Sequence, residues 1–479
     1  MSDEVDTRDH GPMKRLSSIF TSLHDKINQG RRDGGAPVSR APALSSPQLP
    51  GLPSGQAFFE YLVVVSLQRK EGVYQPHITY QFPKLAELGR SQREQEEGTL
   101  KAIPLFCFPE GVNWAPLTEY HSETFSFVLT EVDGSRRNGY CRRLLPGGRG
   151  ARPPEAYCII SRVACFGLFS KIFDEVEKRR QISVAMIYPF MQSLREAPFP
   201  APGDTVNITS FIPESGTQII RLTRPCDSWL EHVDFRVLFG LLTDEEVLTV
   251  FAATVLERRV VFTADELSTL SQVLHAVAAL LYPFSWQHTF ISIVPTVLID
   301  VVMAPTPYLL GVQKNLLDNI HDHSDMLIVD LSAGAESRFI TSMGDEDSLL
   351  PVKLQEELLH ALSSKTTAST PEVLNRVVSE AFLSFFVKTV GHFSSHMKRS
   401  ANGQSRVFQK KSFYNATESK TYRQFVKDFC RTQMFDIFIQ EEEGQPSTHE
   451  GFFQQKVAKY QERKKKEKAK SGWLRGFMV

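Results

Sequence analysis

Two groups of side chains have the types and spacing of a metal site. His392 and His396 stand four residues apart in a stretch with a helical pattern, so both rings could face one ion. A zinc protease would need a glutamate between them and a third ligand, and neither is evident. The segment 321–325, HDHSD, could also chelate a divalent cation, but a polar loop before an apolar strand explains it more simply. We therefore expect no metal and no cofactor.

Motifs for covalent catalysis are missing from the sequence. There is no GxxxxGKS or GxxxxGKT loop to cradle a nucleotide phosphate, and no GxSxG elbow to present a serine nucleophile. Gly147, Gly148 and Gly150 lie beside prolines in a loop rather than at a helix start, which is typical of a flexible connection. A hydrolase is therefore disfavoured, and we expect no catalytic residue and no covalent chemistry.

Arginines and aromatic side chains supply the candidates for contact with a partner protein. Arg258 and Arg259 follow a predicted helix and precede the apolar strand VVFTA. There they either complement the helix dipole, which contributes about 0.3–1 kcal/mol, or contact a partner. The aromatic turn Tyr282–His288 is either part of the core or an exposed anchor. The candidate partner-binding residues are Arg258, Arg259, Asp133, Arg136, Trp286, Gln287 and His288.

The bulk composition excludes several classes of function. The 479 residues carry a net charge of −1, so no global field attracts nucleic acid. No apolar run approaches the roughly 20 residues of a membrane span, and the acidic N-terminus shows no secretory signal. The six cysteines form no CxxC pair and lie in runs such as IPLFCFP, which favours reduced core thiols in the cytoplasm.

An N-terminal arm, residues 1–55, precedes the elements that must position these side chains. Residues 30–56 are rich in Gly, Pro, Ser and Arg, which is typical of a disordered linker. Within the arm, residues 12–27 repeat apolar side chains at spacings of three and four, so they predict an amphipathic helix. This helix would lie on an anionic membrane, dock on its own domain or stay disordered.

A small α/β domain is predicted over residues 56–205. The continuous apolar run FFEYLVVVSL indicates a strand that is buried on both faces. Alternating residues 125–130, the turn Asp133-Gly134 and the returning segment 140–145 indicate a hairpin. A helix follows the strand YCIISRVACF, and one of its faces carries Phe169, Ile172, Phe173 and Val176.

A second α/β domain is predicted over residues 226–360, followed by a helical part over 362–456. Thr243 and Glu246 form a capping box, and Ser268 is expected to cap the next helix. Helices and strands alternate here, which indicates a largely parallel, layered sheet. Beyond residue 362 the pattern predicts only helices, at Glu372–Lys398, Glu418–Gln440 and Phe452–Lys470.

The C-terminal tail, residues 457–479, is basic. It contains the run Arg463-Lys464-Lys465-Lys466, and the apolar residues Trp473, Leu474, Phe477 and Met478 follow it. A solvated helix end is the usual explanation of such a run. Basic charge followed by aromatic residues also suits a weak tether to an anionic membrane, at roughly 1 kcal/mol per charge.

Long segments of the sequence resemble the tripartite DENN module. The segments FFEYLVVVSL, ITYQFP, LKAIPLFCFPEG and YCIISRVACFGLFSKIFDEVEKR are similar to its upstream part. LEHVDF, VLERRVVFTADELSTLSQVLHAVAALLYPFSWQHTFISIVP and APTPYLLGV are similar to its central part. Residues 351–453 are similar to its helical downstream part. The resemblance covers nearly everything after the linker.

The resemblance implies a fold and a function. The expected fold has a longin-like α/β first lobe, a Rossmann-like three-layer α/β central lobe without a nucleotide site, and an all-helical C-terminal part. The implied function is guanine-nucleotide exchange on a Rab GTPase of late endosome-to-Golgi traffic, with the Rab between the first lobe and the rest. We expect a cytoplasmic protein, peripheral on endosomal or Golgi membranes. The alternative is an effector or scaffold that binds a Rab without accelerating exchange. The family has no universal catalytic residue to carry onto this chain.

Overall fold

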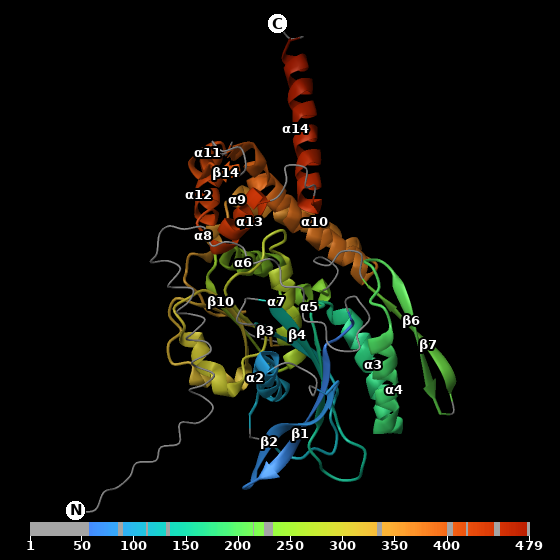
Figure 1. The fold of residues 1–479 in the computed structure, drawn as a ribbon. Coiled ribbons are helices and arrows are strands. Elements are labelled where there is room, and N and C mark those ends of the chain that lie inside the picture. Colours follow the sequence, from blue (N-terminus) through green and yellow to red (C-terminus); the bar gives the residue numbers. More distant parts are fainter. Residues whose placement is uncertain are drawn as a thin grey trace, which may run out of the picture.

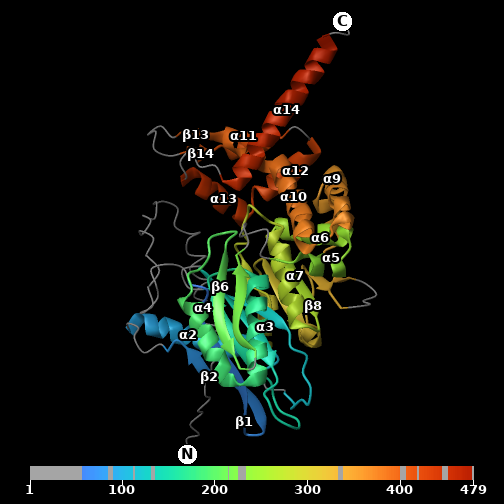
Figure 2. The same ribbon diagram turned by 90° about the vertical axis from the view of Figure 1, so that its right-hand side faces the viewer.

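The computed structural model describes residues 57–84, 90–111, 114–130, 135–213, 215–224, 233–332, 338–399, 406–417, 420–444 and 451–476. The helix predicted over residues 12–27 lies outside these ranges, as do Asp133 and Cys226. Figures 1 and 2 show a first lobe at one end, a central lobe beside it, and a helical part from which the C-terminal helix projects.

The first lobe is built on a five-stranded antiparallel sheet in the order β2-β1-β5-β4-β3. One face packs on helices, and the other joins a core shared with the central lobe. Strand β1 therefore has both faces covered, as its continuous apolar run predicts. The bounds are β1 Tyr61–Lys70, β2 Val73–Phe82, α2 Arg90–Cys107, β3 Thr124–Thr130, β4 Arg136–Leu144, β5 Glu155–Ser161, α3 Phe166–Ile182 and α4 Ile187–Glu196.

A hairpin that the sequence analysis missed follows the first lobe. Strands β6 (Thr205–Ile212) and β7 (Gly216–Thr223) pair in antiparallel register where only a connection between domains was expected. Ile208 and Leu222 are buried against the helices of the first lobe, while Phe211 and Ile219 are 61% and 65% exposed. The surrounding prolines concealed this alternating pattern, because prolines usually mark a loop.

The central lobe contains a mixed sheet in the order β12-β11-β8-β10-β9. Strands β8, β9, β10 and β11 pair in parallel, as predicted, and only β12 is antiparallel. The bounds are α5 Phe235–Leu241, α6 Asp244–Val255, β8 Arg259–Ala264, α7 Leu267–Ala279, β9 Thr289–Ile291, β10 Tyr308–Gln313, β11 Leu327–Asp330, β12 Phe339–Thr341 and α8 Glu346–Leu349, with 3-10 turns at Thr296–Met303 and Lys314–Asn319.

One of the two predicted helix caps is present. The Thr243 side chain accepts a hydrogen bond from the Glu246 amide, and the Glu246 carboxylate accepts one from the Thr243 amide. The capping box is therefore confirmed. Ser268 is not the cap that we expected, because α7 begins at Leu267, one residue before Ser268. Glu266 occupies the cap position, without a side-chain hydrogen bond. The amide of Ser268 instead donates to Glu123 of the first lobe at 3.4 Å.

Helix α7 lies between two sheets. It packs on β8 and β10 of its own lobe and on β3 of the first lobe. Hydrogen bonds also join the lobes: for example, Ser292 Oγ donates to the carbonyl of Ser126 at 2.7 Å, and the Thr296 amide donates to Pro109 O at 2.8 Å. The two lobes therefore share one apolar core.

The C-terminal part is helical, as predicted, apart from a short hairpin of β13 (Met397–Arg399) and β14 (Arg406–Phe408). The helix expected over Glu418–Gln440 is divided into α12 and α13 by a turn. Among the described residues, no helix is both long and apolar enough to cross a bilayer. The helix bounds are α9 Val352–Leu362, α10 Pro371–Val390, α11 Lys410–Asn415, α12 Lys420–Phe429, α13 Gln433–Gly444 and α14 Phe452–Gly476.

Phe284 is one of the aromatic side chains that attach the helical part to the central lobe, and Phe251 of α6 is another. Phe284 of the turn after α7 lies 4.8–4.9 Å, between ring centroids, from Phe386, Phe429 and Phe438. Its side chain is 2% exposed. The turn predicted to be either core or anchor is, at this residue, core.

Gly311 offers a direct test of this packing. A Cβ atom there would lie 2.0 Å from the carbonyl oxygen of Ser292, which is backbone and cannot move aside cheaply. We expect Gly311→Ala to lower the free energy of unfolding by about 2–3 kcal/mol in a denaturant titration. Gly98→Ala is the control, because that position on α2 has no atom within 4 Å. Equal stability of the two variants would contradict the close approach.

His275 on α7 predicts a dependence of stability on pH. Burial, and secondly the charge of Arg136, lower the pKa of His275 from 6.5 to about 4. Because the unfolded chain binds this proton below pH 6.5 and the folded protein does not, acidification through this window favours unfolding. We expect the wild type to lose up to about 3 kcal/mol between these pH values relative to His275→Gln. Parallel stability curves for the two proteins would refute the assignment.

Candidate functional site

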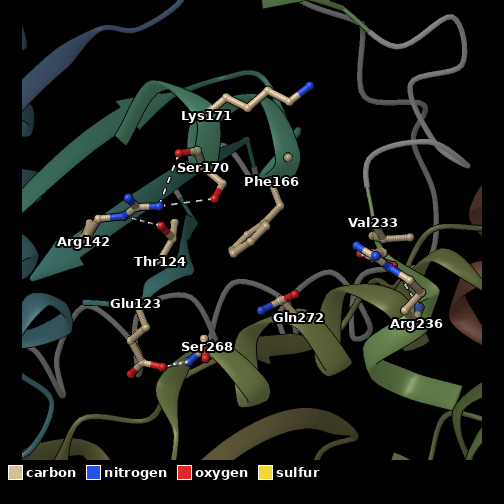
Figure 3. Close-up of a pocket in the computed structure, with 12 residues that line it drawn as sticks. Glu123, Thr124, Arg142, Phe166, Ser170, Lys171, Val233, Arg236, Ser268 and Gln272 are labelled. Atoms are coloured by element: carbon tan, nitrogen blue, oxygen red, sulfur yellow. Dashed lines mark hydrogen bonds and ion pairs between the residues drawn. The ribbon is translucent and has the colours of Figure 1, made fainter. Parts of the chain in front are cut away.

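A groove of about 500 Å³, lined by both polar and apolar surface, opens where the first lobe meets the central lobe. One wall is formed by α3 with β4 and the residues at the start of β3, and the other by α5 and α7 (Figure 3). The lining residues are Glu123, Thr124, Arg142, Phe166, Gly167, Ser170, Lys171, Val233, Asp234, Arg236, Ser268 and Gln272.

Arg142 holds the first-lobe wall together. Its guanidinium donates to Thr124 Oγ1 at 2.8 Å, to Asp174 Oδ1 at 2.7 Å and to Glu177 Oε2 at 3.0 Å. A weaker bond reaches the carbonyl of Ser170 at 3.3 Å. The residue is 7% exposed, so these acceptors compensate a charge removed from water. Arg142 therefore ties β4 to β3 and α3.

Other lining residues have charged or aromatic side chains that are exposed or half-buried. Lys171 and Arg236 are exposed on opposite walls, and Arg236 pairs with Asp234 at 2.5 Å. The hydrogen bond and charge of Asp234 raise the pKa of Arg236. The half-buried Phe166 ring points into the groove from α3 (Figure 3). Two cations and an aromatic ring in a groove are suited to gripping a protein segment.

The predicted Arg258 and Arg259 lie elsewhere and brace the central lobe. Arg258 donates to both carboxylate oxygens of Asp345, at 2.5 and 2.7 Å, and lowers the pKa of that carboxyl. Arg259 donates to the carbonyl of Asp325 at 3.0 Å. Both guanidinium groups therefore have intramolecular partners. A role in binding another protein stays a prediction.

Arg136 and Trp286 meet at the boundary between the two lobes. Arg136 Nη2 donates to the carbonyl of Trp286 at 2.7 Å, and Trp286 Nε1 donates to Thr289 O at 3.0 Å. Trp286 is 3% exposed, so of the two alternatives for the aromatic turn the structure shows the core one at this residue. Its ring is needed in the core beside α7. A role of Trp286 in binding a partner stays a prediction. Gln287 donates to the carbonyl of Ser285.

Glu257 is a functional part of the architecture that we had not assigned. Its carboxylate accepts the amides of Gln433 and Met434 at 2.8 Å each, and so caps helix α13. His288 Nε2 lies 3.0 Å from the same carboxylate. The backbone of Glu257 has φ of 53°, a strained conformation for this residue. Its place between a helix and a strand was the only signal in the sequence.

The groove residues were missed for a physical reason. Lys171, Arg236 and Gln272 come from three helices that are far apart in the sequence, and no local spacing links them. None of the six predicted residues that the structure describes lines the groove. Of these six, the structure brings together Arg136, Trp286 and His288 near α7, whereas Arg258 and Arg259, at the start of β8, contact Asp345 and Asp325.

The histidines and cysteines have structural surroundings. His392 and His396 lie 5.6 Å apart, between ring centroids, and bond to the carbonyl of Phe413 and the hydroxyl of Ser412. Within the described ranges no group of three or more side chains could hold a metal ion. The five described cysteines are buried, and burial raises the pKa of Cys107 and Cys141 well above the ordinary thiol value. Neutral thiols are poor nucleophiles.

Comparison with known protein families assigns three consecutive segments. Residues 76–144 match the uDENN domain, residues 152–334 match the DENN (AEX-3) domain, and residues 408–456 match the dDENN domain. The three segments occur in the order predicted from the sequence.

Full-length relatives support the same assignment. The chain is 57% identical to human DENN domain-containing protein 2D over 425 residues, which are 88% of this chain and 89% of that protein. It is 53% identical to the mouse protein of the same name, over 93% and 95% of the two chains. It is also 49% identical to human DENN domain-containing protein 2B, of which it covers 38%. The chain belongs to the DENN domain family.

Proposed function

We propose that this protein is a guanine-nucleotide exchange factor that promotes GDP release from a Rab GTPase, in late endosome-to-Golgi traffic. The family assignment carries the proposal, because DENN proteins of this group generally act on Rab GTPases in this way. The groove at the lobe junction supports it, since exchange requires a docking surface and no acid, base or nucleophile. We place the activity in the cytoplasm.

Thermodynamic linkage explains how binding alone would release GDP. If the protein binds a nucleotide-free Rab more tightly than a GDP-bound Rab, it must weaken GDP binding by the same factor. A tenfold preference corresponds to about 1.4 kcal/mol. The surface therefore has to select a deformed arrangement of the loops that hold the nucleotide.

The groove has the features that such a surface needs. A stable protein interface buries about 1,600 Å² of surface in total, which is more surface than the walls of this groove can bury. The groove would therefore receive one loop of the Rab, and the adjoining surfaces of α3 and α5 would supply the remaining contact. Lys171 and Arg236 would pair with carboxylates of that loop, and Phe166 would pack on its apolar side chains.

The alternative function is a Rab-binding effector or scaffold, which would need the same surface. The preferred nucleotide state distinguishes the two. An exchange factor retains the empty or GDP-bound Rab, whereas an effector retains the GTP-bound form.

Weak peripheral membrane contact is also part of the proposal. The two segments concerned are residues 12–27, which lie outside the described residues, and the basic C-terminal tail. Endosomal or Golgi membranes are the expected surfaces.

Nucleotide exchange can be measured directly. Release of a fluorescent GDP analogue from a panel of purified Rabs should accelerate for one or a few of them when the full chain is added. Lys171→Glu should lower that acceleration by about tenfold or more, because it places a like charge against the Rab carboxylate. Lys353→Glu on α9 is the matched control, since Lys353 is exposed and remote from the groove.

Three results would count against this proposal. Lack of acceleration on every Rab, with the protein shown to be folded, would exclude exchange on that panel. Retention of only the GTP-bound form would favour the effector. Equal losses for Lys171→Glu and Lys353→Glu would remove the groove from the interface.

A charge swap tests the earlier candidate Arg258. Arg258→Asp alone should destabilise the fold, because it places a carboxylate at position 258 beside the carboxylate of Asp345. Adding Asp345→Arg should restore the ion pair and the unfolding temperature. If Arg258 also contacts the Rab, the double variant will remain slow in exchange; if the pair is only structural, exchange will return to the wild-type rate.

A further inference from the structure

Helix α14 leaves the body of the protein after its first two turns. Phe453 and Val457 are 2% and 5% exposed, and Tyr460 is partly buried against the same core. Beyond Tyr460 most of the described side chains are exposed. Both views show the helix standing out from the helical part with the C-terminus at its far end (Figures 1 and 2).

The base of α14 is firmly attached. The Phe453 ring stacks on Phe393 with centroids 6.3 Å apart, and Lys456 Nζ lies 3.2 Å from Glu380 of α10. A Cβ atom on Gly391 would lie 2.9 Å from a methyl group of Val457, so the Val457 side chain packs directly on the backbone of Gly391. The direction of the helix is thereby fixed. At 1.5 Å per residue, the part after Tyr460 extends for about 24 Å.

The projecting part is cationic on all sides. Arg463, Lys464, Lys465 and Lys466 are consecutive and therefore point in directions about 100° apart around the axis. Only Glu462 and Glu467 oppose them among residues 461–467. Further along, the sequence has Lys468 and Lys470 and then Trp473 and Leu474.

This pattern favours a lipid surface over a protein groove as the partner. A groove that binds a helix needs apolar anchors at spacings of three, four and seven on one face, and residues 461–467 contain none. A planar anionic surface attracts basic residues whatever their direction. Along the helix axis Trp473 lies about 10 Å beyond Lys466. This is close to the Debye length of about 8 Å, the distance over which salt screens the attraction between a charge and a membrane surface.

We infer that α14 docks this protein on an anionic lipid membrane through the charges of Arg463–Lys466. This inference deepens the membrane part of the proposed function and is independent of Rab exchange. The fixed base means that the helix holds the body at a set distance and orientation from the lipid.

Vesicle sedimentation with the full chain tests the inference. The protein should sediment with vesicles of phosphatidylcholine and phosphatidylserine, less so as salt is raised, and hardly with phosphatidylcholine alone. The triple variant Arg463→Glu, Lys465→Glu, Lys466→Glu should lose binding by at least about tenfold. The control variant Lys101→Glu, Lys353→Glu, Lys411→Glu changes the net charge equally at dispersed exposed positions and should bind as the wild type does.

Other outcomes would overturn the inference. Equal losses in the two variants would mean that overall charge, and not α14, governs binding. Failure of the wild type to bind anionic vesicles would exclude the lipid and leave an acidic protein surface as the partner to examine. Because nucleotide release from a Rab in solution needs no vesicle, the α14 variant should retain that activity, and the two proposals can fail separately.

Discussion

The burial of one helix between two sheets is the constraint on which this architecture depends. Helix α7 covers β8 and β10 of the central lobe and also β3 of the first lobe. Its apolar residues are therefore needed on two sides, which explains why most residues of this helix are buried. The lobes cannot separate without exposing this helix, and a groove at their junction is correspondingly a groove with stiff walls.

Charged side chains complete what the apolar core begins. Arg143 of β4 is 2% exposed, pairs with Glu110 and lies 4.8–5.3 Å from the rings of Phe108, Trp114 and Phe125. Glu257 similarly joins the central lobe to α13. Removing one member of such a buried pair leaves the other uncompensated, so these contacts specify how the parts fit together.

The elements could be predicted from the sequence wherever a local pattern determines them. The apolar run of β1, the capping box at Thr243 and the alternation of strands and helices in the central lobe all have local causes, and all are present. Local patterns do not predict a residue's role where a segment distant in the sequence determines its contacts. Ser268 is met by Glu123 of the first lobe, which no spacing near Ser268 reveals.

The candidate site was harder to predict for the same reason. Arginine and tryptophan are common at interfaces, but here Arg258 and Trp286 find partners within the chain. The groove instead uses Lys171 and Arg236, whose meeting depends on how the lobes pack. The predicted domain boundaries share this dependence, since the hairpin β6–β7 packs on the first lobe although it lies beyond the predicted end of that lobe.

Three buried thiols in and beside the first-lobe sheet can report on its motions. Cys141 and Cys158 are direct neighbours on β4 and β5, and Cys107 lies in the same core at the end of α2. All three are fully shielded from solvent. An alkylating reagent can reach them only when the sheet parts from α2 or the central lobe, so the alkylation rate at each cysteine measures the free energy of that opening. The protein thus carries an internal reporter of how tightly its lobes are held.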